Sequence, residues 1–292
     1  MKKSLLLIAG AAMLLNSCGS VPITGRKQLN LVSDSEVLQS SLTQYKSYMS
    51  SATISGEKAQ SEQVTRVGKK LAAATEAYLK ANGLEAEVQN FQWEFNLVKN
   101  NEINAFCMPG GKIVVYEGLM KLVASDDELA VVLGHEVAHA VAKHGNERMS
   151  QQVLAQYGAQ AVGIFTQGKS AATQQIVNQV YGLGANYGVM LPFSRKHESE
   201  ADKMGLVLMS LAGYNPRTAL NFWQKMASSS TAKTPEFMSD HPSDAKRIAD
   251  IEKELPAIEK EYASYINAGK KTTTTTTTTK KTTTKKSTSK KK

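Results

Sequence analysis

The pentapeptide His135-Glu136-Val137-Ala138-His139 lies in a run of residues, from Asp126 to His144, whose apolar positions recur with helical period. Residues four apart in a helix stand on the same face, so His135 and His139 can hold one zinc ion together. Glu136 lies about 100° around the helix from His135. It can accept a proton from a zinc-activated water instead of binding the metal. The motif therefore predicts a rigid helix in the core, with a zinc hydrolase site on one face.

A third protein ligand must come from elsewhere, because catalytic zinc normally takes three. A histidine six residues after the second is one solution, but that position is Gly145, and His144 lies about 140° off the face of His139. We expect His144 to cap a helix or pack. Glu198 and Asp202 are four residues apart in a second predicted helix, so Glu198 can bind zinc while Asp202 accepts the free N–H of a ligand histidine.

The acidic residues around position 200 have a plainer interpretation as an exposed helix face. Glu200, between the two carboxylates just named, is expected to point away from both into solvent. His197 is likewise expected to face solvent. Cys107, on a predicted strand, is expected to pack in the core, because a nucleophilic thiol would need a basic partner.

The first seventeen residues are typical of an export signal. Lys2 and Lys3 precede an apolar stretch, Leu5 to Leu15, that is too short to span a bilayer. Residues 15–18 resemble a bacterial lipobox, which makes Cys18 the expected lipidation site and membrane anchor. The next residue is glycine, not aspartate, which favours an outer-membrane lipoprotein facing the periplasm of a Gram-negative cell. Ordinary secretory cleavage and an uncleaved anchor are the alternatives.

The net charge of +9 over 292 residues comes from the two ends of the chain. Without the nine lysines after Gly269 and the two in the signal, residues 18–269 carry a formal charge of −2. This near-neutral part gives no reason to expect a nucleic-acid partner. Residues 267–292 form a Thr/Lys tail that is expected to be disordered and solvated, although its lysines could bind anionic lipid or glycan.

The remaining segments predict an α+β domain, mostly helical, over residues 34–266, with residues 18–33 as a tether. Residues 91–99, 103–107 and 112–116 have the alternation and composition of short strands, with Pro109-Gly110-Gly111 as a turn. Two helices are predicted before the strands, one that begins near Ser33 or Asp34 and one at about 57–81. Further helices are predicted at about 126–144, 148–165, 172–184, 194–212, 216–228 and 242–264. Residues 151–190 are expected to form a helical hairpin beside the site.

Four blocks of the chain together resemble the gluzincin metalloendopeptidases, the family that includes HtpX, BepA, LoiP and the CAAX prenyl protease. The E-x-x-A-D block separates this family from thermolysin-like gluzincins, and the layout is nearest to the periplasmic lipoprotein branch, such as LoiP. The resemblance covers roughly residues 22–255. The four blocks are Asn104-Ala105-Phe106 with Pro109-Gly110-Gly111, then His135 to His139, then Glu198 to Asp202, then His241-Pro242 with Arg247.

The resemblance implies a zincin-like fold with a small sheet beside the metal helix, and one zinc ion per chain. It implies His135, His139 and Glu198 as ligands, Glu136 as general base and Asp202 as the support of a ligand histidine. His241 would either stabilise the oxyanion or cap the zinc as an inhibitory fourth ligand; it could also be only a residue at a helix N-terminus. Arg247 could serve a structural ion pair or catalysis.

The Asn104 to Tyr116 region is expected to be an edge strand beside the cleft, where an extended substrate can pair with the backbone and contact Asn104. We therefore expect a zinc-dependent endopeptidase that cleaves unfolded or misassembled proteins of the cell envelope. The alternatives are a chaperone-like outer-membrane assembly factor with latent protease activity, and a zinc-binding scaffold without catalysis. The sequence leaves the oligomeric state open.

Overall fold

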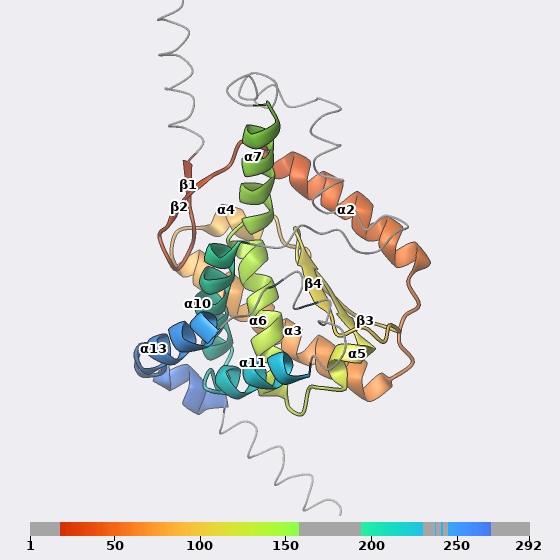
Figure 1. Cartoon of the computed structure of the whole chain (residues 1–292), viewed down its shortest axis with the longest axis vertical. Coiled ribbons are helices and arrows are strands. Elements are labelled where there is room, and N and C mark those ends of the chain that lie inside the picture. Colours follow the sequence, from red (N-terminus) through yellow and green to blue (C-terminus); the bar gives the residue numbers. More distant parts are fainter. Residues whose placement is uncertain (1–17, 158–193, 230–236, 238–240, 242–244, 270–292) are drawn as a thin grey trace, which may run out of the picture.

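The computed structural model describes residues 18–157, 194–229, 237, 241 and 245–269, and within them the fold is α+β and mostly helical, as predicted (Figure 1). One helix, α6, runs through the middle of the molecule, with a small sheet on one side and further helices on the other. The predicted signal segment, most of the predicted hairpin at 151–190 and almost all of the predicted tail lie outside the described residues.

Helix α6 (Asp126–Val141) is almost entirely buried. It begins at the N-cap Ser125, whose side chain accepts a hydrogen bond from the backbone N–H of Glu128, and its first turn carries three acidic residues that favour the positive end of the helix dipole. Helix α10 (Arg195–Leu211) packs against it, as does α3 (Lys58–Ala81). The backbones of α6 and α10 approach closely at Gly134 and Gly205, where a side chain on either residue would contact the other helix.

The sheet has three strands in the order β3-β5-β4, with β3 (Glu94–Val98) parallel and β4 (Ala105–Met108) antiparallel to β5 (Lys112–Tyr116). Gly110 and Gly111, with φ of +92° and +76°, make the turn between β4 and β5 in a backbone conformation that glycine adopts without strain. The predicted edge strand is thus only half right. Strand β4 is the edge beside α6, whereas β5 is fully buried at the centre of the sheet.

Residues 18–33 are not the predicted tether. Strand β1 (Cys18–Ser20) pairs with β2 (Lys27–Leu29), and Val21, Leu31 and Val32 are buried. These scattered apolar residues lack a helical or strand period, but they cover apolar surface that the helices leave open. The segment therefore belongs to the folded domain, and it continues into α2 (Asp34–Ser51), which begins at the predicted cap Ser33.

The other helices are α4 (Glu85–Val88), α5 (Glu117–Met120), α7 (His144–Tyr157), α11 (Thr218–Ser228) and α13 (Ala245–Glu261). Helices α7, α11 and α13 begin within about four residues of the predicted segments, whereas the short helices α4 and α5 were not predicted. Helix α13 packs against α10 on the side away from the sheet, and α11 packs against α6 and α13 (Figure 1). Among the described residues, no helix is both long and apolar enough to cross a membrane.

Candidate metal centre

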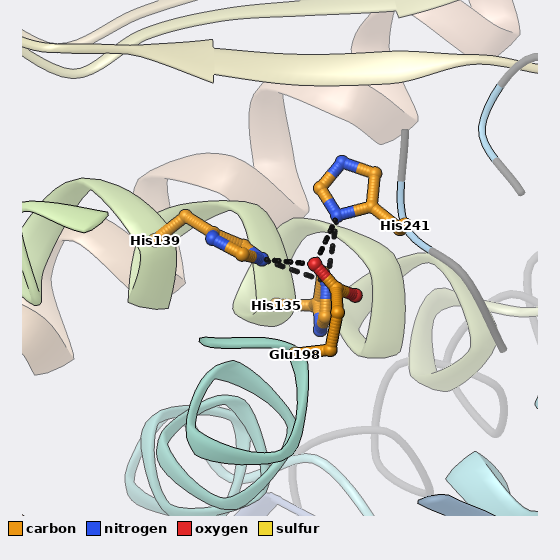
Figure 2. A group of neighbouring side chains, drawn as sticks. All are labelled: His135, His139, Glu198 and His241. Carbon is orange, nitrogen blue, oxygen red and sulfur yellow. Dashed lines mark hydrogen bonds and ion pairs between the residues drawn. The ribbon is translucent and has the colours of Figure 1, made fainter. Parts of the chain in front are cut away.

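Four buried side chains meet between α6, α10 and the segment around residue 241: His135, His139, Glu198 and His241 (Figure 2). Each offers one ligand atom, and the four atoms all lie within 4.8 Å of one another. The Nε2 atoms of His135 and His139 are 3.1 Å apart, and each lies 3.3 Å from a carboxylate oxygen of Glu198. The structure thus brings together the three predicted zinc ligands, with His241 as a fourth member of the group.

The positions of these side chains follow from how their helices are held. The two histidines are one helical turn apart on α6, whose other faces are sealed by the core. Glu198 stands in the first turn of α10, which begins at the N-cap Ser194. Burial alone would raise the pKa of Glu198, but His241, His135 and His139 hold that pKa well below its usual value. Burial lowers the pKa of His139 well below its usual value, so its ring stays neutral and can offer a lone pair.

His241 lies against the group and beside Glu136. Its Nδ1 is 3.1 Å from Oε1 of Glu198, and its Nε2 is 3.4 Å from Oε1 of Glu136. The ring of Phe237 stacks on His241 at a centroid distance of 4.5 Å, and Trp223 stacks on Phe237 in turn. The aromatic stack fixes the side of the group from which His241 approaches.

Asp202 and Arg247 form a buried pair behind His135. Oδ1 of Asp202 is 3.0 Å from Nδ1 of His135, the ring nitrogen that points away from the metal group. Arg247 donates to both oxygens of Asp202 at 2.7 Å, and its Nη1 lies 2.9 Å from Oε2 of Glu198. Burial opposes the charge of Asp202, but Arg247 and then His135 keep the pKa of Asp202 below its usual value. The contacts of Arg247 are those of the structural ion pair considered above.

Glu136 faces the edge strand. The backbone N–H of Cys107 in β4 donates to Oε2 of Glu136 at 3.3 Å, so this amide points at α6 and not at β5. Cys107 is partly buried against the core, and desolvation raises the pKa of its thiol well above the usual value, which agrees with packing and not with a nucleophilic role. Asn104 is also buried; its Oδ1 accepts from the N–H of Ala105, and no contact between Asn104 and the metal group is seen.

A second polar cluster lies behind His139, and the sequence did not predict it. Nδ1 of His144 is 3.0 Å from Nδ1 of His139, and Nε2 of His144 is 3.0 Å from Oε2 of Glu200. Arg26 donates to Glu200 at 2.6 Å and, at 2.6 and 2.9 Å, to both oxygens of Glu147. His144 is fully buried, so the prediction that it packs is confirmed, and burial lowers its pKa to about 4.

Two predictions about this region are wrong. Glu200 is buried, not solvated, because Thr24 and Arg26 of the N-terminal segment and His144 of α7 enclose its carboxylate. Hydrogen bonds from His144, Thr24 and Arg26 overcome the opposing effect of burial and lower the pKa of Glu200 to about 2. His197 is also buried, not solvent-facing; its Nε2 lies 3.1 Å from Glu147, and its ring stacks on His144. The local sign of this cluster in the sequence is the spacing of five residues between His139 and His144.

The donor set fits zinc. Imidazole nitrogens and a carboxylate oxygen are the ligands that zinc takes in catalytic sites, and their burial would shield the ion from bulk water. A histidine pair on one helix, a glutamate from the next and a second glutamate beside the pair define a metallopeptidase site of the glutamate-ligated zincin class.

The comparison with protein families agrees with this class. The model of Peptidase family M48 matches residues 58–255, and the chain belongs to that family of zinc metallopeptidases. The matched region includes both helices of the metal group and the sheet.

Similar proteins carry the names of metalloendopeptidases and of a protease. The chain is 39% identical over 171 residues to "Mitochondrial metalloendopeptidase OMA1" of Schizosaccharomyces pombe, covering 58% of this chain and 48% of that one. It is 36% identical over 168 residues to the Arabidopsis thaliana protein of that name, covering 58% and 33%. It is 31% identical over 164 residues to "Beta-barrel assembly-enhancing protease" of Yersinia pestis, covering 54% and 33%. The chain thus spans about half or less of the length of these relatives.

The comparisons correct one prediction. Similar proteins from fission yeast, Arabidopsis, budding yeast and human are named as mitochondrial, which contradicts the predicted placement in the outer membrane of a Gram-negative bacterium. That placement rested on a short signal-like segment and one residue after Cys18, whereas the similarity extends over the catalytic domain. The family prediction at the level of M48 gluzincins is confirmed.

Proposed function

We propose that the protein is a zinc-dependent endopeptidase whose ligands are His135, His139 and Glu198. The observation that carries the proposal is the buried group of three histidines and one glutamate with Glu136 at its edge. A scaffold that only stored zinc would need the ligands but not Glu136. Here the buried carboxylate of Glu136 lies between Nε2 of His241 and the backbone N–H of Cys107 in the edge strand β4.

When bound, zinc supplies a Lewis acid that polarises the scissile carbonyl and lowers the pKa of an attacking water. Glu136 takes a proton from that water as its oxygen bonds to the carbonyl carbon. It then delivers the proton to the amide nitrogen as the C–N bond breaks. The hydrogen bond from the N–H of Cys107 occupies Oε2 of Glu136, and Oε1 lies beside Nε2 of His241. We propose that Oε1 makes this proton transfer.

We propose that the substrate is an extended segment of an unfolded or misassembled protein. Strand β4 is the edge of the sheet, and main-chain pairing with such an edge gives affinity with little demand on sequence. A cavity of about 70 Å³ borders His139 and Cys107 and can receive one apolar side chain; its apolar lining comes from Val37, Leu38, Leu79, Phe91 and Val141. The contact between substrate and Asn104 stays a prediction.

His241 gives this site a closed resting form. With His241 in place, the group offers four ligand atoms and would complete the four-coordinate set of a structural zinc site, whereas catalytic sites leave one position open. We infer that His241 must withdraw before a peptide carbonyl can bind. This closure supports the second candidate function, an assembly factor whose protease activity is latent. The name of the beta-barrel assembly-enhancing relative is in line with that alternative.

Acylation of Cys18 is a further proposal, and it would tie the domain to a lipid surface. Because β1 begins at Cys18, the catalytic domain would then sit directly at the bilayer with no intervening tether. The mass of the N-terminal peptide of the mature protein tests this, with Cys18→Ser as the control that must lose any lipid mass.

The experiment that tests the function is cleavage of casein by the purified full chain, with bound zinc measured in parallel. Glu136→Gln should retain zinc and fold but lose at least about 100-fold in rate, the size of a general-base contribution. Glu252→Gln, the same change at an exposed position of α13, should cleave like wild type. Substantial cleavage by Glu136→Gln would refute the base assignment.

His241→Ala separates the two candidate functions. If His241 closes the site, this variant should cleave faster than wild type, and a zinc-loaded but inactive wild type would then be latent. If His241 stabilises the oxyanion, the variant should cleave more slowly. Failure of both wild type and His241→Ala to cleave any unfolded protein, with zinc bound, would contradict the peptidase proposal.

A further inference from the structure

The two histidines of the metal group are supported in unequal ways. His135 has a carboxylate directly behind it, Asp202, which Arg247 holds through two hydrogen bonds. Behind His139 there is instead another histidine, His144. A carboxylate and an arginine follow only after that histidine.

The ring nitrogens behind His139 assign the protons along this second chain of contacts. Nε2 of His139 faces the metal group and must carry a lone pair to bind a metal, so the proton of the neutral ring is on Nδ1. That N–H can donate only to a lone pair, which places the acceptor on Nδ1 of His144 and its proton on Nε2. Nε2–H of His144 then donates to Glu200. Each N–H in this series of contacts, from His139 through His144 to Glu200, therefore meets an acceptor.

The far end of the chain is held by the N-terminal segment. Thr24 donates to Oε1 of Glu200, and Nε of Arg26 donates to Oε2. The other nitrogens of Arg26 bind Glu147 on α7, the helix that begins with His144. Gly25, with φ of +68°, turns the chain between the two donors, and the N–H of Val21 closes this turn by donating to the carbonyl of Arg26.

We propose that His144, Glu200 and Arg26 are positioning residues that hold His139 in the tautomer and orientation required for metal binding. The inference rests on the proposed zinc site. A purely stabilising role does not explain the cluster well, because the free energy lost when charged groups are buried is about as large as the free energy gained from their attraction. Orientation of a ligand histidine through its second nitrogen is what such a cluster can supply, and losing such support typically weakens metal binding about 10- to 100-fold.

The proposal also assigns a role to residues 18–33. Arg26 and Thr24 bind Glu200, which is connected to His139 through His144, and the pairing of β1 with β2 holds their segment beside α10 and α7. The N-terminal segment therefore completes the support of a ligand that lies more than a hundred residues further along the chain.

The test is the zinc dissociation constant of the full chain, measured by competition with a chromophoric chelator, together with urea unfolding of the metal-free protein. His144→Leu removes both contacts and should weaken zinc binding about 10- to 100-fold. His144→Asn, whose amide can still reach His139, should recover part of that loss. Arg26→Gln should weaken binding less than His144→Leu. Arg217→Gln removes an exposed arginine paired with Glu259, so it should bind zinc like wild type.

A purely structural role would lower the stability of the metal-free variants and leave their zinc affinity within about threefold of wild type; that result would overturn the proposal. If His144→Leu fails to fold, Glu200→Gln decides, since it keeps the shape of the side chain and removes only its charge. Unchanged zinc affinity in Glu200→Gln would overturn the proposal too. Wild type without measurable zinc affinity would be a different failure, that of the proposed function.

Discussion

Replacing Gly205 with alanine is expected to push apart the two helices that build the metal centre. A Cβ atom on Gly205 would lie 2.9 Å from the backbone nitrogen of His135 and 3.1 Å from the carbonyl carbon of Gly134. Both are backbone atoms in the buried middle of α6, so no change of rotamer can relieve the overlap. Helix α10 must shift instead, and Glu198 and Asp202 shift with it because they lie two turns and one turn upstream.

The expected size follows from two opposing terms. Overpacking of a core costs about 1–3 kcal/mol, and contacts with backbone favour the upper half of that range. Against this cost, the higher helix propensity of alanine stabilises a helix interior by about 1 kcal/mol relative to glycine. The net loss is about 1–2 kcal/mol, which lowers Tm by about 2–8 °C in a domain of this size. Because a ligand and a ligand support both move, zinc binding should weaken about 10-fold or more.

Gly134→Ala is the matched control. It adds the same methyl group at the same helix crossing, but the new atom would meet only the carbonyl oxygen of Gly205 at 3.1 Å, with the next atoms at 3.6 Å. The propensity gain should nearly cancel that one contact, so stability should stay within about 1 kcal/mol of wild type. The assays are urea and thermal unfolding in a chelator, together with zinc competition. Wild-type Tm and zinc affinity in Gly205→Ala, or a greater loss in Gly134→Ala, would refute the reasoning.

Three further results are expected. Ser125→Ala removes the N-cap of α6 and should cost about 1 kcal/mol in urea unfolding, whereas an unchanged midpoint would contradict the capping role. His197 and Arg26 overcome burial to hold the pKa of Glu147 at about 2, below the usual 4.5. The stability that Glu147 contributes is therefore present above pH 4.5 and is lost as the pH falls towards 2. In chelator-treated protein, the difference in the free energy of unfolding between wild type and Glu147→Gln should become smaller over that interval. Zinc at 100 times its dissociation constant should stabilise wild type by about 2.7 kcal/mol, and His139→Ala should abolish that gain in a thermal scan.

The parts of the site that could be predicted from the sequence are those that depend on the spacing between nearby residues. His135 and His139 share a helix face because they are four apart, and the same holds for Glu198 and Asp202. The helix boundaries followed from caps such as Ser33 and from apolar periodicity. The pairing of two helices through one metal group followed from the ligand number that zinc requires, not from any sequence periodicity.

What could not be predicted depends on how many sides of a helix are covered. Period analysis assumes that a helix buries one face and solvates the other. The first turn of α10 violates that assumption. Helix α6 packs against α10, and side chains of residues 18–33 and of α7 bind Glu200 and His197 away from that interface. For this reason the sequence predicts that Glu200 faces solvent and that Arg26 lies in a tether. Nothing local marks Arg26, since its partners Glu147 and Glu200 lie 121 and 174 residues away in the chain.

The same geometry makes α10 the element on which the whole metal centre depends. Its N-terminal turns supply the proposed ligand Glu198 and also the carboxylates of the contacts behind His135 and His139, which are those of Asp202 and Glu200. A displacement of α10 therefore acts on all three proposed ligands at once. Zinc affinity should then respond more steeply than stability to changes that move this helix, and Gly205→Ala should lose more binding than its loss of folding free energy alone would suggest.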